Sequence, residues 1–227
     1  MRIPLQIGRN SSGELYTIDL QALPNLFLSY SEDNQLVNVL QQLIDGISIA
    51  PEQSLIVTCF HKQTTEHLLP IASENNSSGN FYAYSDNNKH RTVDNLIQTV
   101  TKELNLRKRL VAANKLNILK RPSIVVLIDD IFEVITCKHK KTPLSFIELL
   151  LDGSLFGIHF IACSSGIYQN LLDQLVTVSP AMKKRMLKGK HSAGIREPLA
   201  ARMIINPDGL VFFKSRMGSE YVLLYAK

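Results

Sequence analysis

The chain contains 227 residues, 45% of them hydrophobic, and carries a net charge of +5. These totals exclude a disordered chain, and no apolar run approaches the ~20 residues that a membrane-spanning helix needs. Three widely spaced cysteines, Cys59, Cys137 and Cys163, argue against a disulfide framework. The first residues also lack the apolar stretch of a signal peptide. We therefore expect a cytoplasmic protein, either free or as the cytoplasmic part of a membrane-associated assembly.

The amino-terminal half predicts a hairpin followed by alternating strands and helices. Two runs of alternating apolar residues, 3–8 and 15–20, flank a polar turn that contains glycine. Apolar residues at helical spacing indicate a helix over 36–47, with Asp33 or Asn34 as its N-cap. Short apolar runs predict strands at 25–29, 54–60 and 81–84.

The carboxyl-terminal half continues the alternation and ends in strands. A long amphipathic helix is predicted over 93–115, and a shorter helix over 144–151 is stopped by Gly153. A further helix is predicted over 167–176. Continuous apolar runs predict buried strands at 124–128 and 157–165, and turn-separated runs predict a terminal β-meander at 203–205, 210–213 and 221–225.

This order of elements predicts an α/β fold. The central sheet would be mostly parallel and covered by helices on both faces, giving three layers, with antiparallel β additions at both ends of the chain. No repeat or low-complexity linker divides the sequence, so we expect a single domain. Its parts would be an amino-terminal hairpin (1–22), a core (23–180), and a basic segment with the terminal meander (181–227).

The strand over 124–128 is central to the functional prediction because it runs directly into Asp129 and Asp130. Five consecutive apolar residues, four of them β-branched, are typical of a fully buried strand in a parallel sheet. Ligands bind outside the carboxyl ends of such strands. In nucleotide-hydrolysing proteins an acid at this place holds Mg²⁺, and the next acid can orient a water. The alternative is a core strand that ends in a polar turn.

Several segments, in order along the chain, resemble the motor domain of FtsK/SpoIIIE DNA translocases, in the HerA–FtsK branch of RecA-like P-loop ATPases. The resemblance extends over residues 3–170 and implies a RecA-like fold. The matching segments are residues 3–14, the Asp19-Leu20 and Leu23-Pro24 lead into the first core strand, the helix at 103–117, the acidic-ended strand and following helix at 124–135, and the strand that begins Gly157-Ile158-His159.

The resemblance also implies roles for individual residues. Asp129 would ligate Mg²⁺, Asp130 would orient the attacking water, and Ser164 and Ser165 would stand at the sensor position. It further implies Mg-ATP as cofactor, other translocase or secretion-ATPase domains as partners, DNA as a second partner, and a ring oligomer.

The sequence departs from the family at the phosphate-binding loop. The family pattern is Gly-x-x-x-x-Gly-Lys-Ser/Thr, in which backbone N–H groups and the lysine bind phosphates and the hydroxyl ligates Mg²⁺. Counted without gaps, Tyr30 and Gln35 replace the two glycines, Leu36 replaces the lysine and Val37 replaces the hydroxyl residue. The four positions between the glycines hold Ser31, Glu32, Asp33 and Asn34.

These replacements predict a loss of hydrolysis, because phosphoryl transfer is catalysed almost entirely by positioning and charge stabilisation. Removing a single preorganised donor typically costs ~10²–10³ in rate, and several are replaced together. Glu32 and Asp33 would in addition repel a triphosphate. Without a nucleotide, Asp129 and Asp130 need another partner, which we expect to be Ser164, Ser165 or a basic residue.

Two functions of different classes follow. The first is a catalytically silent domain, without cofactor, that acts as a structural, regulatory or substrate-docking module of a DNA- or protein-translocation machine. The second is an ATP-dependent DNA translocase domain that uses Mg-ATP through an atypical phosphate loop. A third, a plain DNA-binding protein, would bind duplex in a salt-dependent way.

Three basic runs are candidates for contact with DNA or a partner, and each could also be a solvated surface. They lie at 107–109, 138–141 and 183–190. The last run, which we take as the main candidate, contains Lys183, Lys184, Arg185, Lys188 and Lys190.

Overall fold

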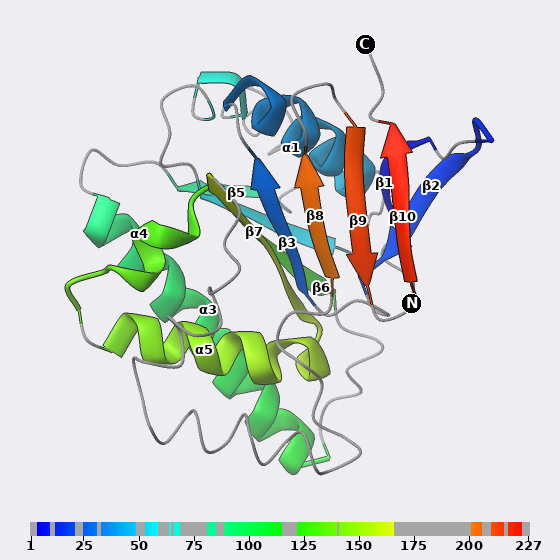
Figure 1. Ribbon diagram of the computed structural model, residues 1–227. Coiled ribbons are helices and arrows are strands. Elements are labelled where there is room, and N and C mark those ends of the chain that lie inside the picture. The colour runs from blue at the N-terminus through cyan, green and yellow to red at the C-terminus, as the bar shows by residue number, and fades with distance from the viewer. Residues whose placement is uncertain are drawn as a thin grey trace.

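The strands of the chain form one ten-stranded sheet in the computed structural model (Figure 1). The structure describes residues 4–9, 12–20, 25–30, 33–48, 53–58, 64, 66–68, 81–84, 89–114, 122–139, 141–165, 201–205, 210–215 and 218–223. The predicted helix at 167–176 and the basic run at 183–190 lie outside these residues.

Strands and helices alternate along the described chain, as the sequence predicts. The first elements are β1 (Pro4–Arg9), β2 (Leu15–Asp19), β3 (Asn25–Tyr30), α1 (Asp33–Ser48), β4 (Gln53–Thr58), β5 (Phe81–Tyr84) and α3 (Lys89–Ala112). They are followed by β6 (Ser123–Ile128), α4 (Ile131–Ile135), α5 (Lys141–Asp152), the 3-10 helix η3 (Gly153–Phe156), β7 (Ile158–Ser165), β8 (Ala201–Ile205), β9 (Leu210–Ser215) and β10 (Gly218–Leu223).

The strand order is β2-β1-β10-β9-β8-β3-β7-β6-β4-β5. The strands from β8 to β5 are parallel to one another, while β9, β10, β1 and β2 are added in antiparallel pairs. The predicted α/β fold with a mostly parallel central sheet is thereby confirmed. The additions from the two chain ends lie on one side of the sheet, where Arg9 of β1 pairs with Leu223 of β10.

Two local features differ from the prediction. Helix α1 begins at Asp33, so both residues proposed as its N-cap lie inside its first turn. Helix α3 begins at Lys89, earlier than the apolar periodicity indicated, because its first turn is basic rather than apolar.

The central strands are buried on both faces. All six residues of β3 are buried, and β6 has the same character, since a parallel sheet is covered by helices on each side. Helix α1 packs against β1, β3 and β4, whereas α3, α4 and α5 pack together on the other face (Figure 1). None of the described helices is both long and apolar enough to cross a membrane.

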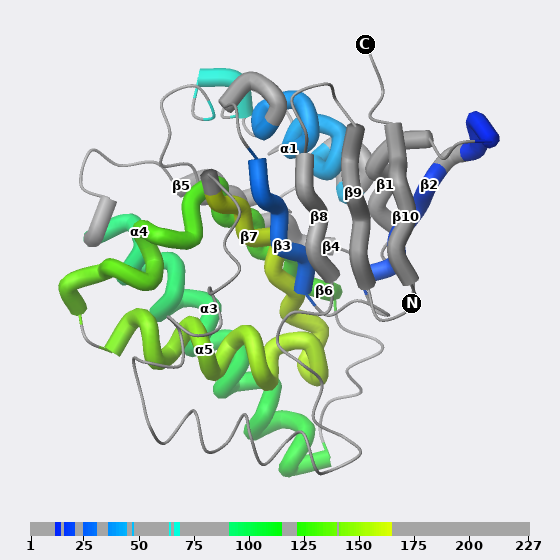
Figure 2. Tube along the Cα trace, viewed as in Figure 1, coloured from blue at the N-terminus to red at the C-terminus, as the bar shows by residue number. Residues whose placement is uncertain are grey.

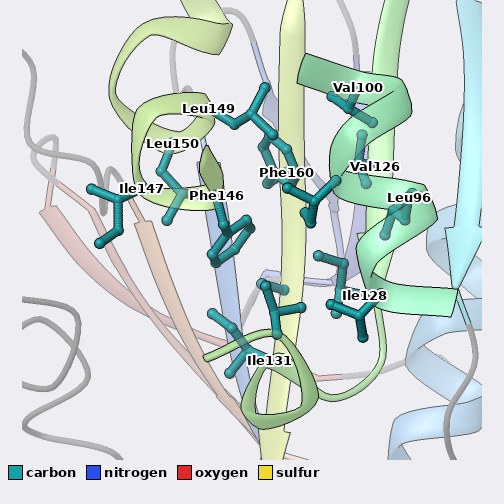
Figure 3. Close-up of a cluster of buried hydrophobic side chains, with 14 of the residues drawn as sticks. Leu96, Val100, Val126, Ile128, Ile131, Phe146, Ile147, Leu149, Leu150 and Phe160 are labelled. Atoms are coloured by element: carbon teal, nitrogen blue, oxygen red, sulfur yellow. The ribbon is translucent and has the colours of Figure 1, made fainter. Parts of the chain in front are cut away.

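The core under α3 and α5 joins alternate positions of the central strands to the apolar faces of the helices (Figure 3). Phe146 of α5 packs edge-on against Phe160 of β7, with ring centroids 5.5 Å apart and planes at 81°. Val126 and Ile128 of β6 lie opposite Leu96 of α3. Figure 2 draws β3, β6 and β7 of this core in colour. The candidate site lies at the carboxyl ends of these strands.

Candidate functional site

The carboxyl ends of β3, β7 and β6 meet at one edge of the sheet. Tyr30 at the end of β3 is in register with Ser165 of β7, and Ile128 at the end of β6 is in register with Ala162. Asp129 and Asp130 follow Ile128 directly, so the two acids and Ser164 share this edge. The strand register therefore brings together the acidic and sensor residues predicted from the sequence.

The two aspartates have different environments. Asp129 is fully buried, with 0% of its surface exposed, and has a partner within the structure. Asp130 is half-buried and caps α4: its Oδ1 accepts a hydrogen bond of 2.9 Å from the backbone N–H of Phe132. Asp130 has the extended backbone typical of an N-cap, with φ −140° and ψ 105°. One oxygen of the proposed water-orienting carboxylate is thus engaged in local structure.

Ser164 of β7 has a buried hydroxyl for which the described part of the chain supplies no hydrogen-bond partner. Of the partners predicted for the two aspartates, which were Ser164, Ser165 or a basic residue, the Ser164 hydroxyl is therefore contradicted. The side chain of Ser165 lies outside the described part of the structure. Leaving a buried hydroxyl unpaired is unfavourable, because the lost bond to water is not replaced.

The connection between β3 and α1 is short. The strand ends at Tyr30 and the helix begins at Asp33, so two residues join them. Tyr30 is buried, and Leu36, at the position of the family lysine, has 0% of its surface exposed. Val37 is half-buried on the same helix.

The remaining predicted site residues are described only in part or not at all. Asp33, Asn34 and Gln35 form the first turn of α1, and only their backbone is described. The following lie outside the described residues: Ser31, Glu32, Lys183, Lys184, Arg185, Lys188 and Lys190. Their proposed roles remain predictions.

The opposite, amino-terminal edge of the sheet contains a buried arginine that the sequence analysis took for part of a surface run. The Arg107 guanidinium donates to the carbonyl oxygens of Phe156 at 2.7 Å and Pro122 at 2.9 Å, and to Glu103 Oε1 at 2.8 Å. Pro122 precedes β6 and Phe156 precedes β7, so Arg107 joins the start of both strands to α3. Gly157 allows this approach: its φ is 72°, and a Cβ there would lie 3.1 Å from Nη1 of Arg107.

Asn25, the first residue of β3, is a second polar group that the sequence analysis missed. Its Nδ2 donates to the carbonyl oxygen of Leu150 in α5 at 3.0 Å, and its Oδ1 accepts from the N–H of Phe160 at 3.2 Å. An amide at the start of a buried strand was the available sequence signal, since buried amides need partners.

Lys108, the next residue in the same basic run, bridges two helices. Its Nζ lies 2.9 Å from Glu148 and 2.8 Å from Asp152, both on α5. Partial burial alone would lower the pKa of the ammonium, but the hydrogen bonds and charges of Asp152 and Glu148 outweigh it, so the pKa is raised. The 107–109 run is therefore not a continuous basic surface, and of its three residues only Arg109 is exposed.

Metal-ligand and redox chemistry find little support in the described ranges. Cys137 and Cys163 are buried free thiols, and His159 is buried and partnered in β7. Within those ranges, no group of three or more His, Cys, Asp or Glu side chains could hold a metal ion. Cys59 lies outside them.

The chain is similar to known proteins in structure but shows little similarity to them in sequence. No family model matches the chain, and no curated protein matches it. EssC (ATPases 2 and 3) from Geobacillus thermodenitrificans is similar with a TM-score of 0.67 at 10% identity, over 99% of this chain and 41% of that one. The pCW3 conjugation coupling protein TcpA, solved with ATPγS, gives a TM-score of 0.64 at 11% identity, over 99% of this chain and 66% of that one.

The type VII secretion ATPase EccC from Thermomonospora curvata is similar in two structures. Its cytoplasmic domain gives a TM-score of 0.65 at 15% identity, over 100% of this chain and 26% of that one. Its ATPases 2 and 3, in complex with a signal sequence peptide, give a TM-score of 0.62 at 15% identity, over 100% of this chain and 40% of that one. The chain has the fold of an FtsK/SpoIIIE-type ATPase domain. It spans only a quarter to two thirds of the length of these chains, and at such identities the likeness concerns the fold.

Proposed function

We propose that the chain is a catalytically silent FtsK/SpoIIIE-like domain. It acts as a structural, regulatory or substrate-docking module of a translocation machine, and it takes no cofactor. The short connection from β3 to α1 is the observation that carries this proposal.

A phosphate loop needs several residues of non-helical backbone after the strand, so that successive N–H groups can turn toward the anion. Here helix α1 already occupies positions 33–35, which would belong to that loop. Leu36, at the lysine position, is fully buried, so an aliphatic side chain occupies an apolar environment where a cation would reach the phosphates. The residues on the phosphate side therefore do not fit Mg-ATP.

The acidic side of the site supports the same proposal. Asp130 serves as the N-cap of α4, which gives the carboxylate a structural reason to be present. Asp129 is buried and partnered within the structure. Asp130 thus has a role, and Asp129 a partner, that require neither magnesium nor nucleotide.

The fold neighbours support the proposal that the chain belongs to a translocation machine. EccC is named as a type VII secretion ATPase and was solved with a signal sequence peptide, and EssC is solved as a pair of ATPase units. We propose that this chain, as one such unit in a single domain, docks to other secretion or translocase ATPase domains in a cytoplasmic assembly. A polypeptide is the favoured substrate of that assembly.

One observation favours the second candidate, an ATP-dependent translocase domain that binds DNA. The hydroxyl of Ser164 stands at the sensor position, buried and without a partner. An unpaired polar group at this edge is what a site awaiting a ligand would show. The alternative requires residues 31–35 to form a phosphate cradle, which a helix beginning at Asp33 opposes.

Calorimetric titration of the whole chain with Mg-ATP separates the candidates. The silent domain gives no saturable heat up to millimolar nucleotide, and no hydrolysis above the buffer rate with or without duplex DNA. The matched variant is Asp129→Asn, which keeps the size of this buried side chain. Micromolar affinity in the wild type that falls in the variant, with an unchanged melting temperature, would overturn the proposal in favour of the translocase.

A further inference from the structure

Helices α3 and α5 lie side by side and run in the same direction (Figure 1). Near their amino-terminal ends, Thr142 Oγ1 of α5 donates to Asp94 Oδ1 of α3. Near their carboxyl-terminal ends, Lys108 of α3 bridges to Asp152 of α5 at 2.8 Å. These two contacts fix the register of the pair, so the first turn of α5 lies beside the second turn of α3, close to its amino-terminal end.

Two basic segments that are far apart in the sequence meet at this end. Arg91 is exposed in the first turn of α3, and Lys138, His139 and Lys141 are exposed just before and at the start of α5. The same segments include Lys89, His90 and Lys140. We call Arg91, Lys138, His139 and Lys141 the α3/α5 basic patch.

The described residues of this patch carry more positive than negative charge. A helix amino terminus carries a positive dipole end that acidic residues normally offset, yet neither α3 nor α5 has an acid in its first turn. Asp94, the nearby carboxylate, is already engaged by Thr142 and by Gln98 at 2.7 Å. In the described part of the chain, neither Lys138 nor Lys141 has an ion-pair partner. Within the described residues, Lys138 and Lys141 thus lie beside two helix ends whose first turns hold no acid, a combination that favours an anion.

We propose that the α3/α5 basic patch docks an acidic polypeptide segment of a partner domain. The inference rests on the proposed docking role and names the surface that performs it. Carboxylates suit helix amino termini and lysines alike, through charge and through hydrogen bonds to N–H groups.

The size and composition of the patch favour carboxylates over a nucleic-acid backbone. The segments 89–94 and 138–142 contain no Phe, Tyr or Trp on which a base could stack. Asp94 lies between the two helix ends, where it would repel a continuous row of phosphates. The positive charge is confined to one end of a helix pair rather than spread along a stripe. A short acidic segment can place its carboxylates on either side of Asp94.

Fluorescence anisotropy with a labelled ten-residue Glu-rich peptide and the full chain tests the proposal. The wild type is expected to bind the peptide at low salt and to lose affinity as salt rises. The double variant Lys138→Gln/Lys141→Gln should bind at least tenfold more weakly and melt no earlier than the wild type. The matched control, Lys102→Gln/Arg109→Gln, removes two exposed cations elsewhere on α3 and should bind as the wild type.

Three outcomes would overturn the inference: no binding of the peptide, equal loss in the patch variant and the control, or tighter binding of a duplex DNA of similar charge that depends on Lys138 and Lys141. The last would make the patch a nucleic-acid site. None of these results bears on the Mg-ATP titration. If the chain binds neither the acidic peptide nor Mg-ATP, only the inference about the patch is refuted. If the chain binds Mg-ATP, the proposed function itself is refuted.

Discussion

The two edges of the parallel sheet differ in how their buried polar side chains are bonded. At the amino-terminal edge, Arg107 and Asn25 give specific hydrogen bonds to strand starts and to α5. At the carboxyl-terminal edge there are a fully buried acid, Asp129, and a buried hydroxyl, that of Ser164, for which the described residues supply no partner. The first edge is built for stability, whereas the second contains one buried hydroxyl, that of Ser164, which stability alone does not explain.

This contrast fits the silent domain that we propose, in which the fold would persist without a working phosphate loop. Ligands bind outside the carboxyl ends of parallel strands, so substitutions there leave the opposite edge and the core intact. The strands, their register and the helix pair α3/α5 depend on contacts that lie elsewhere. Substitutions at each edge should therefore separate stability from ligand binding.

The largest expected effect is at the amino-terminal edge. Arg107→Ala should lower the free energy of unfolding by about 3–4 kcal/mol, because the variant loses a buried guanidinium that pairs with Glu103 and donates to the carbonyls of Pro122 and Phe156. Urea titration followed by circular dichroism measures this loss. The control is Arg109→Ala, an exposed neighbour whose change should stay within about 0.5 kcal/mol. Equal effects of the two variants would contradict the contrast between the edges.

At the carboxyl-terminal edge, Asp130→Ala should cost about 1 kcal/mol through loss of the N-cap of α4. Asp130→Asn should leave the stability nearly unchanged, because asparagine caps as well as aspartate. The pair sharpens the comparison, since a water-orienting role would make Asp130→Asn lose any hydrolysis at unchanged stability. Thermal melts and a phosphate-release assay on the same samples measure both quantities.

Ser164→Ala should have an effect of the opposite sign. Its hydroxyl is buried and has no partner, so its removal should raise the free energy of unfolding by up to about 1 kcal/mol. Chemical denaturation of the variant beside the wild type measures the change. A clear destabilisation would show that the hydroxyl is bonded, and would bring the two edges closer in character.

The smallest effect concerns the bridge from α3 to α5. Lys108→Met should cost about 0.5–1 kcal/mol at neutral pH, since the pairs with Glu148 and Asp152 are partly exposed to solvent. The native pKa of Lys108 is raised, so its contribution is complete below the ordinary value of 10.5 and is lost as pH rises through the native pKa. The wild type and the variant should therefore converge in stability at strongly alkaline pH. A constant difference across that range would refute the bridge as its cause.

Local patterns predicted the central elements well. The continuous apolar run at 124–128 identified β6, because a strand buried on both faces is apolar at every position. Helical spacing identified α3 and α5, because a helix buried along one stripe is apolar at every third or fourth position. The pairing of β1 with β10 and of β8 with β3 could not be read in the same way. Such pairings join segments distant in the chain, and no local period encodes which strand becomes the neighbour.

The candidate site was predicted in position but not in bonding. Register places Asp129 and Ser164 at one edge, as expected, yet the hydroxyl makes no hydrogen bond. The run at 107–109 was interpreted as one surface, whereas successive helical residues point about 100° apart. Arg107 is therefore buried, Lys108 bridges to α5 and Arg109 is exposed.

Thermal denaturation with and without Mg-ATP tests whether the chain binds nucleotide, because a ligand that binds the native chain must raise its stability. A nucleotide present at ~100 times its Kd would stabilise by ~2.7 kcal/mol, which for a chain of this size raises the Tm by roughly 5–10 °C. The account predicts no shift at millimolar Mg-ATP for the wild type or for Asp129→Asn. A rise of several degrees in the wild type that disappears in Asp129→Asn would contradict it.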